Sequence, residues 1–175
     1  QLDLADVSGR IGNVAHEPNL GVTVAFDLGI ADSTAIWFVQ QMPHENIIRV
    51  IDYYEESGEG LHHYVKILRE RPYNYDKYLF PHDVMVRELG SGSSRYEILQ
   101  SLGIRPTVIP KLTVADGIEA VRAIIPRCHF DRGGCEEGFD IITGNLMTAL
   151  TIGKIDPTTI GRHIVRTVLD ISPLV

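Results

Sequence analysis

The hydrophobic pattern of the first third of the chain predicts three strands in succession. Residues 22–26 (Val-Thr-Val-Ala-Phe) are β-branched and apolar, which is typical of a buried strand. Residues 34–39 form a second run of this kind, and residues 47–51 form a third. Because the connections between these runs are too short for a crossover helix, we expect an antiparallel meander.

Helices and single strands alternate after the meander. Apolar spacing and turn residues predict a helix over 61–68, a strand over 78–80, a helix over 94–102, a strand over 107–109 and a helix over 116–125. Ser94 followed by Glu97 is a capping box, which marks the start of the second of these helices. This order predicts an α/β fold of the ribonuclease H-like kind, in which three antiparallel strands and then parallel additions form a mixed sheet flanked by helices.

Composition fits a soluble globular protein. The 175 residues are 44% hydrophobic and 22% charged, which supplies enough apolar side chains for one core. No apolar run reaches membrane-spanning length, and the start lacks the pattern of a signal peptide. The net charge of −7 argues against a surface coated with basic patches for nucleic acid, although carboxylates that bind divalent ions also add negative charge. Cys128 and Cys135 are easily left as thiols, and a single disulfide is the alternative. Because they lack the second paired motif of a zinc site, we do not expect zinc.

The chain divides into three expected segments. Residues 1–20 are mixed in character and carry turn-forming residues, which indicates a linker or a loosely docked arm. Because the first residue is Gln1 and not Met, we expect a fragment of a longer protein. Residues 21–140 hold the predicted elements and form the domain, and residues 141–175 form an atypical tail.

Two aspartates carry the candidate chemistry. Asp27 ends the first predicted strand, and Asp83 follows the fourth. If these strands are neighbours, both carboxylates face one cleft, where they repel each other unless a cation lies between them. Two Mg²⁺ ions in such a place activate a water on one side of a phosphodiester and stabilise the leaving oxygen on the other. Each residue alone is more simply a turn or helix-cap residue, and the pair on neighbouring strands favours the metal site.

Other polar positions have a functional and a plainer interpretation. Asp32 begins the second strand and is a candidate for holding a second metal or positioning water, and a turn residue is an equally good interpretation. His82 is a candidate for a place near the scissile phosphate, although a solvated loop histidine is simpler. The stretch 89–95 (Leu-Gly-Ser-Gly-Ser-Ser-Arg) has backbone N–H groups and a helix start suited to a phosphate, or it is a flexible connector. The candidate DNA contacts around it are Arg87, Ser91, Gly92, Ser93 and Arg95.

Longer stretches of the chain resemble the nuclease domain of the large terminase subunit of tailed bacteriophages. The resembling stretches, in order, are 23–38, 51–61, 80–84, 87–95 and 116–122. The similarity runs from about Gly9 to about Asp140. Because the matches are long and in the same order, this signal is far more specific than any single motif.

The resemblance implies a metal-dependent endonuclease of a phage or prophage, which cuts concatemeric double-stranded DNA in the host cytoplasm. By the family pattern, Asp27 and Asp83 are ligands of two Mg²⁺ or Mn²⁺ ions, and Asp32 is an auxiliary acid. The family also implies an ATPase domain before Gln1, with a portal protein and a small terminase subunit as further partners and no membrane. No G-x-x-x-x-G-K-[ST] motif occurs here, so this chain alone should not hydrolyse ATP.

The tail departs from the family. The family carries a third acidic ligand on a late helix, in a pattern like H-D-W-x-S-H-x-A-D, and the acids Asp140, Asp156 and Asp170 lack these surroundings. The genetic code allows this pattern in another reading frame. Each shifted codon takes the third base of one residue's codon and the first two bases of the next. Across residues 158–171, such codons can encode H-D-W-x-[ST]-H-x-A-D-x-x-R-Y. We therefore predict that the tail is a frame-shifted reading of the family ending. The chain as written should then lack the third ligand, bind metal weakly and cut DNA poorly or not at all.

Two rival functions remain open at this point. An actin-like or sugar-kinase-like ATPase also begins with a strand and Asp-Leu-Gly, but such proteins need a second, related loop that this sequence lacks. A non-catalytic module that docks the packaging motor on the portal or on DNA is the stronger alternative, because the family's third ligand is missing from the tail.

Overall fold

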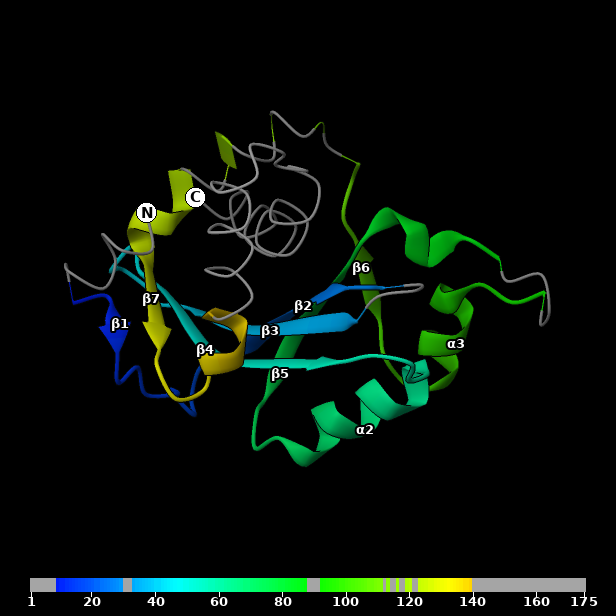
Figure 1. Cartoon of the computed structure of the whole chain (residues 1–175), viewed down its shortest axis with the longest axis horizontal. Coiled ribbons are helices and arrows are strands. Elements are labelled where there is room, and N and C mark those ends of the chain that lie inside the picture. Colours follow the sequence, from blue (N-terminus) through cyan, green and yellow to red (C-terminus); the bar gives the residue numbers. More distant parts are fainter. Residues whose placement is uncertain are drawn as a thin grey trace, which may run out of the picture.

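The computed structural model describes residues 9–139, with gaps at 30–32, 88–91, 112, 114–115, 117–118 and 121–122. Within this part of the chain, seven strands form one mixed sheet in the order β1-β7-β4-β3-β2-β5-β6 (Figure 1). The strands are β1 (Ile11–Gly12), β2 (Val22–Asp27), β3 (Thr34–Gln41), β4 (Ile48–Glu56), β5 (Tyr75–Phe80), β6 (Pro106–Val108) and β7 (Cys128–Asp131). Strand β3 is antiparallel to both β2 and β4, whereas the other pairs are parallel.

Helices α2 (Leu61–Glu70) and α3 (Arg95–Ser101) pack on one face of this sheet. The amphipathic pattern of α2 buries Tyr64, Val65 and Leu68 against alternate side chains of β2 and β3. Figure 1 shows α2 in the connection that carries the chain from the end of β4 back to the start of β5. Short 3₁₀ turns, η1 (His82–Met85) and η2 (Ile125–Arg127), follow β5 and precede β7.

The opposite face carries a second core. Trp37 of β3 and Tyr53 of β4 pack there, with ring centroids 4.4 Å apart. Ile124, Ile125 and Cys135 cover these rings from the last third of the described chain. The two faces alternate along β3 and β4 as the period of a strand requires.

The predicted core of the fold is confirmed. The three-strand meander is present, and its second and third strands run further than expected, to Gln41 and Glu56. Strands β2 and β5 are parallel neighbours, with Ala25 opposite Leu79. The expected capping box is present, because Ser94 and Glu97 cap each other's backbone N–H groups. In the predicted helix 116–125, the described residues up to 124 are helical and Ile125 begins the 3₁₀ turn η2. Residues 117–118 and 121–122 lie outside the described part.

Residues 9–20 differ from the linker or loosely docked arm expected of residues 1–20. Strand β1 adds to the sheet beside β7, with Ile11 opposite Phe130. The Arg10 guanidinium donates to the carbonyl of Ile125 at 2.6 Å, and the N–H of Val14 donates to Asp131 Oδ1 at 2.8 Å. Residues 1–8 and the tail 141–175 lie outside the described residues, as does its proposed frame shift. No helix among the described residues is long and apolar enough to span a membrane.

Candidate metal centre

Asp27 is the last residue of β2, and its side chain is only 6% exposed. It lies directly opposite Ala35 of β3, and Ala35 lies directly opposite Glu55 of β4. Residues opposite each other in neighbouring strands point to the same face of a sheet. Asp27 and Glu55 therefore lie on the same face of the sheet. Only the methyl side chain of Ala35 lies between them in this row across the three strands.

Asp83 is held by the 3₁₀ turn that follows β5. The N–H of Val84 donates to the carbonyl of Pro81, and the N–H of Val86 donates to the carbonyl of Asp83, both at 3.0 Å. Val84 is fully buried, which anchors the turn in the core. The Oδ1 atom of Asp83 is also buried, and it accepts no hydrogen bond from the residues that the structure describes.

The two aspartates lie at the same edge of the sheet. Because β2 and β5 are parallel neighbours in register at Ala25 and Leu79, Asp27 and Asp83 both follow the paired region in the same direction. The rings of Phe26 and Phe80 stack with centroids 4.3 Å apart, which locks the ends of these two strands together. The predicted placement of both carboxylates at neighbouring strand ends is thus what the structure has.

The donor set suits a hard divalent cation. Carboxylate oxygens are the ligands that Mg²⁺ and Mn²⁺ prefer, and a buried carboxylate oxygen without a partner is costly unless a cation or donor satisfies it. Asp83 Oδ1 is such an atom. Among the described residues, however, no group of three or more His, Cys, Asp or Glu side chains is placed to hold a metal ion. Asp32, the third predicted acid, lies outside the described residues.

A hydrogen-bond network beside Asp27 was not expected from the sequence. The Tyr53 hydroxyl donates to Glu55 Oε2 at 2.5 Å, and the Ser33 hydroxyl donates to Glu55 Oε1. Burial raises the pKa of Tyr53 far above its ordinary value, and the carboxylates of Glu55, Glu137 and Asp27 raise that pKa further. The strand alternation of β4 is the signal that could have placed Tyr53 and Glu55 on the face of Asp27.

The predicted phosphate loop has partners within the chain. Arg87 donates to the carbonyl of Gly92 at 2.9 Å and forms an ion pair with Glu97 at 3.1 Å. The Glu97 carboxylate accepts from the N–H of Ser94, which is the main reason that the pKa of Glu97 is lowered. The capping box thus already occupies the N–H groups of Ser94 and Glu97. Ser91 lies outside the described residues, and DNA contact by Arg87, Gly92, Ser93 and Arg95 stays a prediction.

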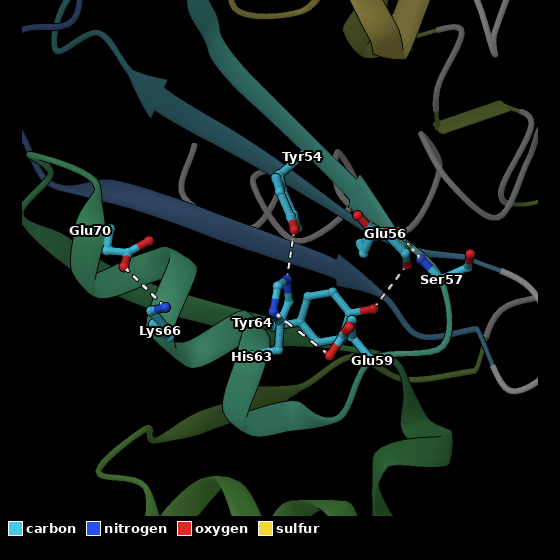
Figure 2. Close-up of polar contacts among 8 residues, drawn as sticks. All are labelled: Tyr54, Glu56, Ser57, Glu59, His63, Tyr64, Lys66 and Glu70. Atoms are coloured by element: carbon cyan, nitrogen blue, oxygen red, sulfur yellow. Dashed lines mark hydrogen bonds and ion pairs between the residues drawn. The ribbon is translucent and has the colours of Figure 1, made fainter.

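A second polar network secures the end of β4 from the α2 side. Figure 2 shows Tyr54 pointing at His63, with the hydroxyl 2.7 Å from Nε2. The Tyr64 hydroxyl donates to the carbonyl of Glu56 at 2.9 Å, and Glu59 lies 3.8 Å from His63 Nδ1 (Figure 2). Tyr54 packs with the α2 core, so this network lies on the face opposite Asp27 and Glu55. Side-chain hydrogen bonds therefore stabilise the end of β4 on both faces of the sheet.

Comparisons with known proteins agree with this architecture. No protein-family model and no curated protein matches the chain. The nuclease domain of P22 large terminase matches with a TM-score of 0.55 at 11% identity, over 92% of this chain and 91% of that one. The large terminase nuclease domain of bacteriophage SPP1, solved with bound Mn, matches with a TM-score of 0.53 at 14% identity, over 92% and 94%.

A longer structure also matches. The large terminase of the thermophilic bacteriophage D6E, in complex with ATP-gamma-S, has a TM-score of 0.58 at 16% identity, over 78% of this chain. The match covers 35% of that chain, so the present chain spans about a third of the D6E protein. These likenesses show the fold: the chain has the ribonuclease H-like mixed sheet of large terminase nuclease domains.

Proposed function

We propose that this chain is the nuclease domain of a phage packaging terminase and cuts concatemeric double-stranded DNA with divalent metal ions. The observation that carries the proposal is the pair Asp27 and Asp83 at the carboxyl ends of neighbouring parallel strands. One buried carboxylate oxygen of this pair, Asp83 Oδ1, has no hydrogen-bond partner among the described residues. The likeness of the fold to terminase nuclease domains, one of them solved with bound Mn, supports it.

Asp27 and Asp83 would hold Mg²⁺ or Mn²⁺, and two ions are the number that phosphodiester hydrolysis of this kind uses. When bound, such ions activate a water and stabilise the leaving oxygen. The buried position of Asp27 fixes its carboxylate and limits its motion. The 3₁₀ turn does the same for Asp83, because Val84 anchors it in the core.

The partners of the whole protein follow from the proposed family. Double-stranded DNA is the substrate, and an ATPase domain, a portal protein and a small terminase subunit complete the motor in the host cytoplasm. The match covers 35% of the D6E large terminase, so most of that protein has no counterpart in this chain. Phosphate contacts carry no sequence information directly, so we expect cutting with little sequence preference.

The test is cleavage of linear duplex DNA by the purified chain in Mn²⁺. We expect Asp27→Ala to lower the cleavage rate at least about a hundredfold, because a bound metal ion contributes several kcal/mol of transition-state stabilisation. Asp76→Asn is the matched control, since Asp76 lies near the other end of β5. Circular dichroism checks that both variants fold. Full activity in Asp27→Ala, purified free of contaminating nuclease, would refute the proposal.

One observation favours a second candidate, a non-catalytic module that docks the motor on DNA or the portal. The described residues contain no cluster of three metal-binding side chains. A chain of this kind would bind duplex DNA and leave it intact in Mn²⁺. The same assay therefore separates the two functions, with a gel-shift measurement to detect binding.

A further inference from the structure

The connection that follows Asp27 is tied to the end of β4. It runs from Leu28 to Ser33, immediately before β3 begins at Thr34. The N–H of Gly29 donates to Thr34 Oγ1 at 3.3 Å, and the Ser33 hydroxyl donates to Glu55. Both described ends of this connection therefore have a side-chain anchor.

Glu55 is itself held in place. Its second carboxylate oxygen accepts from the Tyr53 hydroxyl, and Tyr53 is buried against Trp37. Because strands in a sheet lie about 4.8 Å apart, Asp27 and Glu55 are about 10 Å apart along their row. Both oxygens of Glu55 are engaged by hydroxyl groups, which suits an anchor better than a direct metal ligand.

From this geometry we infer that Glu55 is a positioning residue of the candidate metal centre. It holds Ser33, and the next residue, Thr34, accepts from the N–H of Gly29, two residues after Asp27, so that Asp27 keeps its place. The inference rests on the proposed function. Hydrogen-bonding partners around metal ligands commonly change metal affinity about 10- to 100-fold when they are removed. Glu55 would act in that way through the hydrogen bonds that join Ser33 to Glu55 and Gly29 to Thr34.

The neighbouring Glu56 provides the matched control. Its carboxylate is exposed and accepts from the N–H of Ser57, on the α2 side of the strand. Removing the Glu56 carboxylate changes the charge at this edge as much as removing that of Glu55. It leaves the hydrogen bond between Ser33 and Glu55 intact.

The experiment measures Mn²⁺ affinity of the full chain by electron paramagnetic resonance, without DNA. We expect Glu55→Ala and Ser33→Ala each to weaken binding about tenfold, and the double variant to be no weaker than either, because both remove the same hydrogen bond. Glu55→Gln should restore the affinity, since its amide can still bond to both hydroxyl groups. Glu56→Ala should bind as the unchanged chain does.

The outcomes separate the two proposals. Absence of Mn²⁺ binding by the unchanged chain overturns the proposed function and this inference with it. Binding that Asp27→Asn removes and that Glu55→Ala and Ser33→Ala leave unaltered overturns the inference alone. If Glu55→Ala fails to fold, Ser33→Ala decides the question, because it is a small change at a partly exposed position that removes the same hydrogen bond. A purely structural role would lower thermal stability and leave the Mn²⁺ affinity of the folded protein unchanged.

Discussion

The buried position of the Asp83 side chain lowers the stability of the folded protein. Its Oδ1 atom is buried and has no hydrogen-bond partner in the described part of the chain. Leaving a buried polar atom unsatisfied costs about 1–3 kcal/mol, and more for a charged group. Proteins tolerate such a cost where function requires it, because ligand binding offsets it. Asp83 is therefore the residue at which stability and metal binding should oppose each other most directly.

We expect Asp83→Asn to raise the free energy of unfolding in metal-free buffer by up to about 1 kcal/mol, because a neutral amide is less costly to bury than a carboxylate. Mn²⁺ should raise the melting temperature of the unchanged chain, because a ligand that binds the folded state stabilises it. It should leave the melting temperature of the variant unaltered, because the variant has lost a metal ligand. Thermal denaturation with and without Mn²⁺ measures both effects. Asp76→Asn should keep the Mn²⁺ response, and a destabilised Asp83→Asn protein would contradict the argument.

Among the elements, β7 and the turn after it join the last described segment to the sheet. The N–H of Tyr53 donates to the carbonyl of Gly134 at 2.9 Å, so this turn touches β4 beside the network of Glu55. Asp131 accepts from the N–H of Gly134 and from that of Val14, which ties β1, β7 and the turn together. The close approach leaves no space for a side chain at Gly134. A Cβ atom there would lie 2.4 Å from the carbonyl oxygen of Ile51.

Gly134→Ala should therefore destabilise the protein by about 1–3 kcal/mol, the usual cost of overpacking, because the clashing atom belongs to the backbone and cannot turn away. Gly133→Ala is the control, since its Cβ would meet only Asp131 Oδ2 at an ordinary 3.5 Å. Urea denaturation of the two variants gives the comparison. Equal stability of the two would show that the turn is not packed on β4 as described.

At the scale of the whole molecule, the sheet topology brings acidic side chains together at one edge of the sheet. Strands β2, β4 and β5 run in the same direction, so their carboxyl ends lie together and bring Asp27, Glu55 and Asp83 to one side. Only two of these carboxylates, Asp27 and Asp83, are proposed metal ligands, whereas the terminase resemblance implies three. The missing acid would come from the tail, if the tail were read in the family's frame.

We predict that restoring that frame after Asp140 adds the third acid and strengthens Mn²⁺ binding, because each added carboxylate ligand increases the attraction for a divalent ion. Sequencing the gene gives the first check, through the bases under residues 158–171. Comparing Mn²⁺ affinity between the present chain and the frame-restored chain gives the second. If the bases in the other frame do not encode the H-D-W…A-D pattern, the predicted frame shift is wrong and the tail is the natural ending of the protein.

Periodicity and local motifs were enough to predict much of the fold. The meander β2–β4, helix α2 and the capping box of α3 depend on residues within a few positions of each other, which is the range over which hydrophobic alternation and capping act. The pairing of β2 with β5 followed from the order of elements, and it brought Asp27 and Asp83 to one edge. Those two aspartates became candidates because Asp27 ends a recognisable strand and Asp83 follows another.

The remaining features depend on contacts between distant residues. Strand β1 pairs with β7 across more than a hundred residues, and Val14 bonds to Asp131 at a separation of 117, so neither segment shows its role in its own sequence. The anchor at Glu55 likewise needs the register that sets Glu55 opposite Ala35 and the turn that brings Ser33 to it. A strand pattern says which residues share a face, but register and packing decide which side chains on that face touch, because both depend on the balance of all the contacts made at once.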